Sequence, residues 1–158
     1  MAYRMRIPDQ WVKSSPGVVN FGPVIYNVDQ PVGSGCPNRS DDVLLVQYFI
    51  TMWAGPYKNS KGGTTSVLTG TNSTLIQRLP RINGVVDGVT ITWIMLFQLL
   101  QFPQGRQPDG RVDPASPGMS PHHPNTILLL NMWGKVNEGL SLPVNMPPQL
   151  QTALQNVR

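Results

Sequence analysis

The stretch that decides the fold runs from Asn83 to Gln98 and reads NGVVDGVTITWIMLFQ. Its first half is a turn sequence, because Asn-Gly favours a tight reversal in which glycine takes a positive φ. Its second half predicts a helix over about 90–102, in which Ile94 and Phe97 recur at helical spacing and face the core. Since leucine, methionine and tryptophan make this segment apolar nearly all round, we expect it to be the central, most buried helix.

Two further helices are predicted, one on each side of this segment. The first begins near Ser40, a good N-cap, and the two aspartates that follow complement the positive end of the helix dipole. We expect Gly55-Pro56 to end it. The other covers about 125–133, with Gly134 as its C-cap. The sequence therefore predicts a mainly α fold around three helices.

The chain is long enough for one domain with flanking arms, at 158 residues with 16 prolines and 15 glycines. We predict an extended, Pro/Gly-rich arm over 1–37, a helical domain over 38–134 and a C-terminal arm with a short helix over 135–158. β-prone residues in the first arm also allow a short β-hairpin there. No internal repeat is evident in the sequence.

Charge excludes some functions. Charged residues make up 13% of the chain, about half of what is usual in a soluble domain. The net charge is +4, but the basic residues are scattered, which argues against nucleic-acid binding.

The longest apolar-rich stretch, 91–100, is too short to span a membrane. No signal core follows the first residues, so we expect synthesis in the cytoplasm without a cleavable signal peptide and, if the chain leaves, export by a signal-independent route.

The sequence gives little support for a catalytic or metal-binding site. Cys36 is the single cysteine, so it is expected to be a loop residue without a disulfide or a cysteine-based metal site. His122 and His123 are adjacent, whereas ligand pairs are usually spaced to meet on one face. Asp109 and Asp113 are explained by turn formation. We therefore expect no enzyme, no metal and no cofactor.

Three stretches, in order, resemble the peptidoglycan-binding-like domain family: NRSDDVLLVQ over 38–47, NGVVDGVT over 83–90 and DGRVDP over 109–114. The resemblance covers about 32–133. The chain differs from the family pattern in having Asn where Asp is usual at the second motif, and in an insert over 115–124 before the last helix.

The resemblance implies a small three-helix domain of the kind found in wall-targeted bacterial and phage-associated proteins, beside amidases, lytic enzymes and type VI secretion effectors. It implies a non-catalytic peptidoglycan-binding or targeting module that acts with a partner or a secreted assembly. Around its signature turn the expected contacts to wall peptide or amino sugar are Arg81, Asn83, Asp87 and Thr90. The competing explanation is that these residues form the turn and cap the helix, and their turn-forming residue types favour this explanation over ligand contact.

A second expected contact set is Tyr57 with Lys58, in a polar loop predicted over 55–74. The competing function is structural. The same fold serves equally well for protein–protein contacts, because a fold does not fix a function. The chain would then be a subunit of a filament, a phage-like particle or a secretion apparatus, as a homo-oligomer or part of a larger assembly.

Overall fold

The chain is mainly helical, with a small amount of strand in two small sheets. The computed structural model describes residues 1–6, 24–59, 78–102, 105–119, 124–138 and 146–155. Its helices within these residues are α2 (Ser40–Asn59), α3 (Gly88–Gln101), α4 (Thr126–Glu138) and α5 (Pro148–Ala153). Its strands are β1 (Tyr3–Arg6), β2 (Val24–Asn27), β3 (Val32–Gly33) and β4 (Arg111–Val112). β1 pairs antiparallel with β2, and β3 pairs antiparallel with β4. No helix of the described part is both long and apolar enough to cross a membrane.

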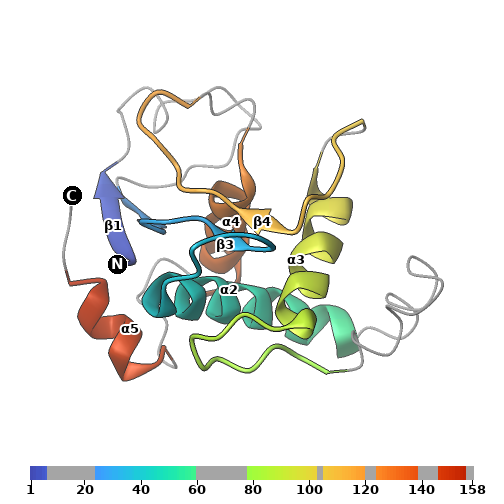
Figure 1. Cartoon of the computed structure of the whole chain (residues 1–158), viewed down its shortest axis with the longest axis horizontal. Coiled ribbons are helices and arrows are strands. Elements are labelled where there is room, and N and C mark those ends of the chain that lie inside the picture. The colour runs from blue at the N-terminus through green and yellow to red at the C-terminus, as the bar shows by residue number, and fades with distance from the viewer. Residues whose placement is uncertain (7–23, 60–77, 103–104, 120–123, 139–145, 156–158) are drawn as a thin grey trace.

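Helix α2 lies at the centre of the molecule and contacts α3, α4 and α5 (Figure 1). The expectation that α3 would be the most buried helix was wrong. Met95 and Leu99 on α3 are 39% and 45% exposed. An apolar composition does not require burial on every side, and α2 occupies the central position instead.

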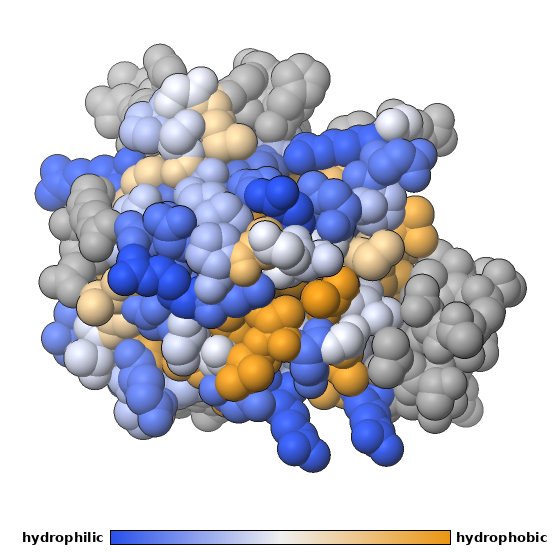
Figure 2. Space-filling model, viewed as in Figure 1, coloured by the Kyte–Doolittle hydropathy of each residue, from blue (hydrophilic) through white to orange (hydrophobic). Residues whose placement is uncertain are grey.

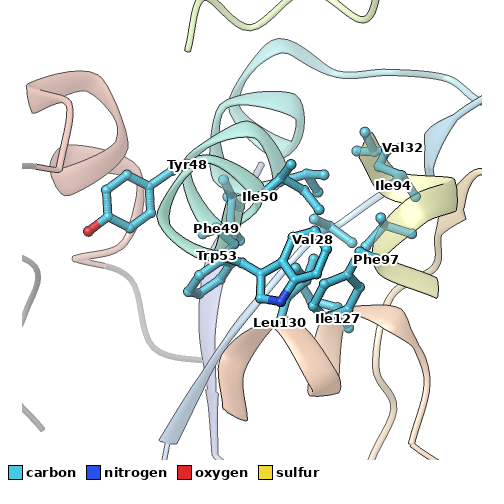
Figure 3. Close-up of a cluster of buried hydrophobic side chains, with 14 of the residues drawn as sticks. Val28, Val32, Tyr48, Phe49, Ile50, Trp53, Ile94, Phe97, Ile127 and Leu130 are labelled. Carbon is cyan, nitrogen blue, oxygen red and sulfur yellow. The ribbon is translucent and has the colours of Figure 1, made fainter. Parts of the chain in front are cut away.

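The core is built where the three long helices meet (Figure 3). Ile94 and Phe97 are fully buried, as predicted. The Trp53 ring meets Phe97 edge-on, with centroids 5.0 Å apart, and meets Trp93 in the same way. Trp133 of α4 lies at the edge of this core and is 37% exposed. Its indole N–H donates a hydrogen bond to the Gln101 side-chain oxygen at the surface, at 2.8 Å.

Two of the three predicted helix ends were wrong, although the starts were close and α3 ends at Gln101 as expected. Helix α2 begins at Ser40 and continues through Gly55 and Pro56 to Asn59. Helix α4 passes Gly134 and ends at Glu138. Proline can join a helix because its φ is already helical, and propensity is a weak local preference that the surrounding structure overrides.

Described parts of both predicted arms belong to the same core. Met5 and Ile25, from β1 and β2, are buried with the helices, and so is Leu150 of α5. Asn131 of α4 clamps β2: its side-chain nitrogen donates to the Tyr26 carbonyl at 2.7 Å, and its oxygen accepts from the Tyr26 N–H at 2.8 Å. Strand β2 therefore has β1 on one side and a helix side chain as a further partner.

Asp42 lies in the first turn of α2, as expected, and its carboxylate also has partners outside the helix. Its side chain is fully buried, and it accepts hydrogen bonds from the backbone N–H groups of Asp29 and Gln30 at 3.0 and 3.1 Å. Burial raises the pKa of Asp42, while these two hydrogen bonds oppose that shift. The carboxylate thus ties the segment after β2 to the start of α2.

Candidate binding site on two glutamine-held turns

A buried glutamine of α2 holds the turn that begins the decisive stretch. The Gln47 side-chain oxygen accepts from the backbone N–H groups of Asn83 and Gly84, both at 3.0 Å. Its nitrogen donates to the Val85 carbonyl at 2.8 Å, and to the side-chain oxygens of Asn83 and Thr90 at 3.3 Å each. One side chain therefore fixes a complete reversal of the backbone and the start of α3.

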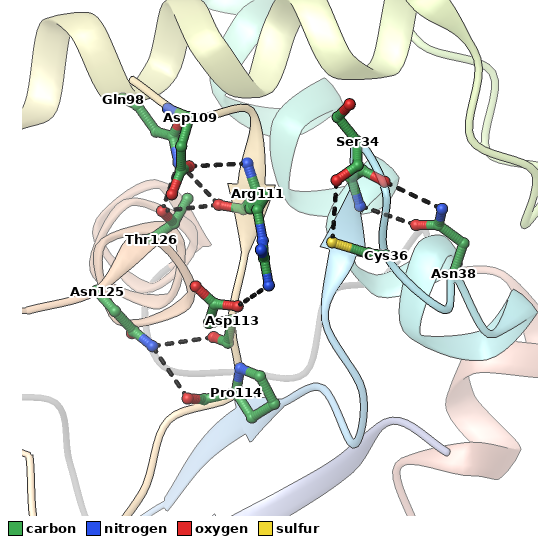
Figure 4. Close-up of polar contacts among 11 residues, drawn as sticks. Ser34, Cys36, Asn38, Gln98, Asp109, Arg111, Asp113, Pro114, Asn125 and Thr126 are labelled. Atoms are coloured by element: carbon green, nitrogen blue, oxygen red, sulfur yellow. Dashed lines mark hydrogen bonds and ion pairs between the residues drawn. The ribbon is translucent and has the colours of Figure 1, made fainter. Parts of the chain in front are cut away.

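A second glutamine, on α3, repeats this arrangement (Figure 4). The Gln98 oxygen accepts from the N–H groups of Asp109 and Gly110 at 3.0 and 2.9 Å. Its nitrogen donates to the Arg111 carbonyl and to the Asp109 carboxylate, both at 2.7 Å, and to the Thr126 hydroxyl at 3.0 Å. Gln98 therefore ties α3 both to this turn and to the start of α4.

The two turns also agree in backbone geometry. Gly84 and Gly110 have φ of +74° and +69°, in the left-handed region that favours glycine. In the first turn the Asn83 side-chain oxygen accepts from the N–H two residues later at 3.0 Å, and Asp109 does the same in the second at 2.9 Å. α2 to α3 and α3 to α4 are therefore joined by the same structural unit.

This structural repeat was missed in the sequence because its two copies have different spacing. Gln47 lies 36 residues before Asn83, whereas Gln98 lies 11 residues before Asp109. The available signal was the pair of short matches NGVVD and DGRVD, each followed by a threonine at the next helix start. The insert of the second copy is closed at its base by Asn125, which donates to the Asp113 and Pro114 carbonyls at 2.9 and 3.1 Å (Figure 4).

The predicted contact residues of the first turn are brought together, but most bond inward. Asp87 caps α3, since its carboxylate accepts from the Thr90 N–H and hydroxyl, both at 2.7 Å. Asn83 and Thr90 bond to Gln47. Arg81 alone of the four has an exposed side chain that no described residue pairs with.

The other predicted pair, Tyr57 and Lys58, lies in the last turn of α2 and not in a loop. The prediction of a loop from residue 55 was therefore wrong at its start, because the helix does not stop at Gly55-Pro56. The side chains of Tyr57 and Lys58, and residues 60–74 of the predicted loop, lie outside the described residues.

The two turns differ in what they present to solvent. At the position after the glycine the second turn carries Arg111, whose guanidinium pairs with Asp113 at 3.2 Å. The first turn carries Val85, which is 62% exposed. The sequence did not predict that Val85 or its neighbours form a binding surface, because a single exposed valine belongs to no recognisable motif.

Partly buried apolar residues and two exposed arginines flank Val85 in the sequence. We define the Val85 face by these residues: Arg78, Arg81, Ile82, Val85, Val86 and Val89. No described residue forms a hydrogen bond or an ion pair with either guanidinium. Figure 2 shows apolar surface near the loop that leads into α3, beside projecting hydrophilic groups.

The described residues contain no group of three or more His, Cys, Asp and Glu side chains that would hold a metal ion. His122 and His123 lie outside these residues. Cys36 is half-buried in a loop, and its thiol donates to the Ser34 carbonyl at 3.4 Å (Figure 4). Burial raises the pKa of Cys36 more than the nearby Arg111 lowers it. The thiol is therefore protonated at neutral pH, which disfavours its use as a nucleophile.

No family model, curated protein or solved structure matches the chain.

Proposed function

We propose that this chain is a non-catalytic peptidoglycan-binding module that acts with a partner or a secreted assembly. The finer fold behind this proposal is a three-helix peptidoglycan-binding-like domain formed by α2, α3 and α4. Its support is the order of the three motifs, together with the two glutamine-held turns that join these helices.

The observation that carries the proposal is the Val85 face. It combines the exposed Val85, on a turn that Gln47 holds by hydrogen bonds, with two exposed arginines that precede this turn in the chain. An exposed apolar patch with polar flanks marks a binding surface. Wall peptides carry alanine methyl groups and carboxylates, which match such a surface. Because Asn83, Asp87 and Thr90 are engaged internally, we assign ligand contact to Arg81 and Val85 instead.

Sedimentation with purified, insoluble peptidoglycan tests this function. We expect the folded chain to pellet with the wall material, and Arg81→Ala to shift it toward the supernatant. Circular dichroism of the variant serves as the folding control. A wild-type chain that stays in the supernatant at every wall concentration contradicts the proposal.

A second candidate function, assembly of a larger protein structure, is favoured by a different surface. The 14 residues of α3 contain no charge, and its outer side exposes Met95 and Leu99. Neighbouring exposed apolar residues of this kind mark protein contacts. Light scattering separates the two functions. Assembly is supported, in place of wall binding, if the chain forms a high-mass species that the Leu99→Lys substitution dissociates and if the chain does not pellet with the wall.

A further inference from the structure

We propose that the outer side of α3 is a contact surface for a second copy of this chain, and that the two copies pack antiparallel about a two-fold axis through Met95. This inference is separate from wall binding. It rests on assembly, the second candidate function, and names the partner and the geometry of the contact.

The contact surface is a strip of side chains along α3, which runs along one side of the molecule (Figure 1). Residues three or four positions apart lie on the same side of a helix. At this spacing α3 and its C-cap carry Gly88, Ile91, Met95, Leu99 and Phe102. Met95 and Leu99 are 39% and 45% exposed, Gly88 is exposed, and the other two are half-buried. We call these five residues the α3 strip.

Contacts within the molecule mark one edge and one end of the α3 strip. A Cβ atom on Gly110 would come within 3.2 Å of Ile91 Cγ2 and of Met95 Cγ, so the turn before β4 borders both side chains. The Arg106 guanidinium lies over the Phe102 ring, 4.0 Å from its centroid. Arg106 therefore stands at the C-terminal end of the strip.

The α3 strip is complementary in size to a reversed copy of itself. Met95 lies seven residues from both Gly88 and Phe102, so a two-fold axis through Met95 places Phe102 of one copy against Gly88 of the other. A Cβ atom on Gly88 would meet nothing within 4 Å, which leaves room there for an aromatic ring. Ile91 and Leu99, each four residues from Met95, face one another across the same axis.

The two ends of the α3 strip carry opposite charges, with no charged residue in the helix between them. At the start, both hydrogen bonds that Asp87 accepts from Thr90 use Oδ1, and Oδ2 has no hydrogen-bond partner among the described residues. At the end, Arg106 donates to the Pro124 carbonyl at 3.1 Å but forms no ion pair with a described residue.

This charge pattern selects both the occupant and its orientation. Antiparallel packing of two copies brings each Asp87 next to the Arg106 of the other chain, and opposed helix dipoles attract. Parallel packing would instead place like charges together, which opposes association. A second copy in reverse orientation therefore satisfies the apolar strip and both of its charged ends.

The first experiment measures self-association of the full chain by sedimentation equilibrium over a wide range of concentrations. We expect a weak, concentration-dependent dimer, because one pair of helices buries less than the about 1,200 Å² of a standard interface. Met95→Lys places two like charges on the axis and should weaken the dimer by at least tenfold. Gln149→Lys adds the same charge at an exposed position of α5, at the opposite end of the molecule, and should have no effect (Figure 1).

The second experiment tests the charged ends with two conservative variants. Asn is as good an N-cap as Asp, so Asp87→Asn removes the charge and keeps the cap. Asp87→Asn and Arg106→Gln should each weaken the dimer by roughly threefold to tenfold, since each removes both exposed ion pairs. The double variant should be no weaker than either single variant, because the two residues are partners. Additive effects would overturn the pairing.

The third experiment tests the antiparallel geometry by disulfide cross-linking with oxidised glutathione, in a Cys36→Ser background that removes the native thiol. Met95→Cys should form a covalent dimer, because this residue meets its own copy on the axis. Leu99→Cys should not, because its two copies lie about 12 Å apart along the helices, beyond the about 7 Å that a disulfide spans between Cα atoms. Equal cross-linking of the two variants would overturn the antiparallel arrangement.

Failure of this inference is distinguishable from failure of either proposed function. A wild-type chain that stays monomeric at every concentration overturns both self-association and the second copy as occupant of the α3 strip, whereas pelleting with peptidoglycan decides wall binding independently. If a high-mass species forms and Met95→Lys leaves it intact, assembly stands and the α3 strip is not its surface. Circular dichroism of each variant confirms that the fold is retained.

Discussion

Two buried glutamines organise the molecule at the scale of single residues. Gln47 and Gln98 each use both side-chain atoms on a turn and on the threonine that begins the next helix. Gln98 is close in sequence to its turn, so its contact was predictable. The contacts of Gln47 could not be predicted, because its partners lie 36 or more residues away in the sequence. Contacts over such distances are decided by packing, which local sequence does not encode.

Replacing Gln47 with leucine should be strongly destabilising. The change leaves two backbone N–H groups and the Val85 carbonyl without their partner, and each buried unpaired group costs about 1–3 kcal/mol. We expect a loss of about 3 kcal/mol in the free energy of unfolding, measured by urea denaturation. Gln107→Leu, at an exposed loop position, is the control and should stay within about 0.5 kcal/mol of wild type. Equal effects of the two substitutions would show that the clamp does not stabilise the fold.

The exposed residues were the least predictable part of the candidate site. Asn83, Asp87 and Thr90 were selected from a motif, and the structure gives all three internal partners. Val85 and Arg78 were not selected, because the exposure of a turn residue depends on which side of the turn the core occupies. A single sequence carries no sign of that side.

At the scale of elements, the helix starts were predictable, and of the three predicted helix ends only that of α3 was. Starts are set by side chains that bond to free N–H groups, such as Asp87 on Thr90. Ends depend on whether packing sustains a poor helix former, and Pro56 and Gly134 both lie inside helices. The two short sheets join segments far apart in sequence, such as β3 with β4, and no local pattern specifies such pairs.

The turn before α3 offers a sharp test at this scale. A Cβ atom on Gly84 would come within 2.3 Å of the Ser40 hydroxyl oxygen, and its φ is already positive. Gly105 has a positive φ of +94° but open space around it. We expect Gly84→Ala to lower the free energy of unfolding by at least about 2 kcal/mol more than Gly105→Ala does. Thermal denaturation of the two variants measures this difference, and a smaller loss for Gly84→Ala would refute a tight joint between α2 and the turn.

At the scale of the whole molecule, one core spans segments from near both ends of the chain. Ala2, Leu150 and Leu154 are buried with the long helices. The mainly α class and the three long helices followed from periodicity, whereas the packing of the predicted arms did not. Their short apolar segments are too weakly patterned to show that they enter a core.

The packing of α5 against α2 predicts that the C-terminal segment unfolds with the rest. Leu150 is fully buried, and its truncation to alanine should cost about 2–5 kcal/mol. Circular dichroism and tryptophan fluorescence should report one coincident transition at a lower denaturant concentration. Gln149→Ala, at the exposed position before it, should leave the midpoint nearly unchanged. Two separate transitions in the Leu150→Ala variant would instead show an independent tail.

The hydrogen bonds from Asn83 and Gly84 to Gln47 also affect how readily this Asn-Gly pair deamidates. Asn-Gly pairs lose ammonia when the glycine nitrogen attacks the asparagine amide carbon, a common form of chemical wear in proteins. Here the N–H of Gly84 is engaged by Gln47 and the amide oxygen of Asn83 by the Val85 N–H. The pair is thus restrained from cyclising. Conversion to aspartate would in any case leave the residue type that the equivalent turn already carries at Asp109.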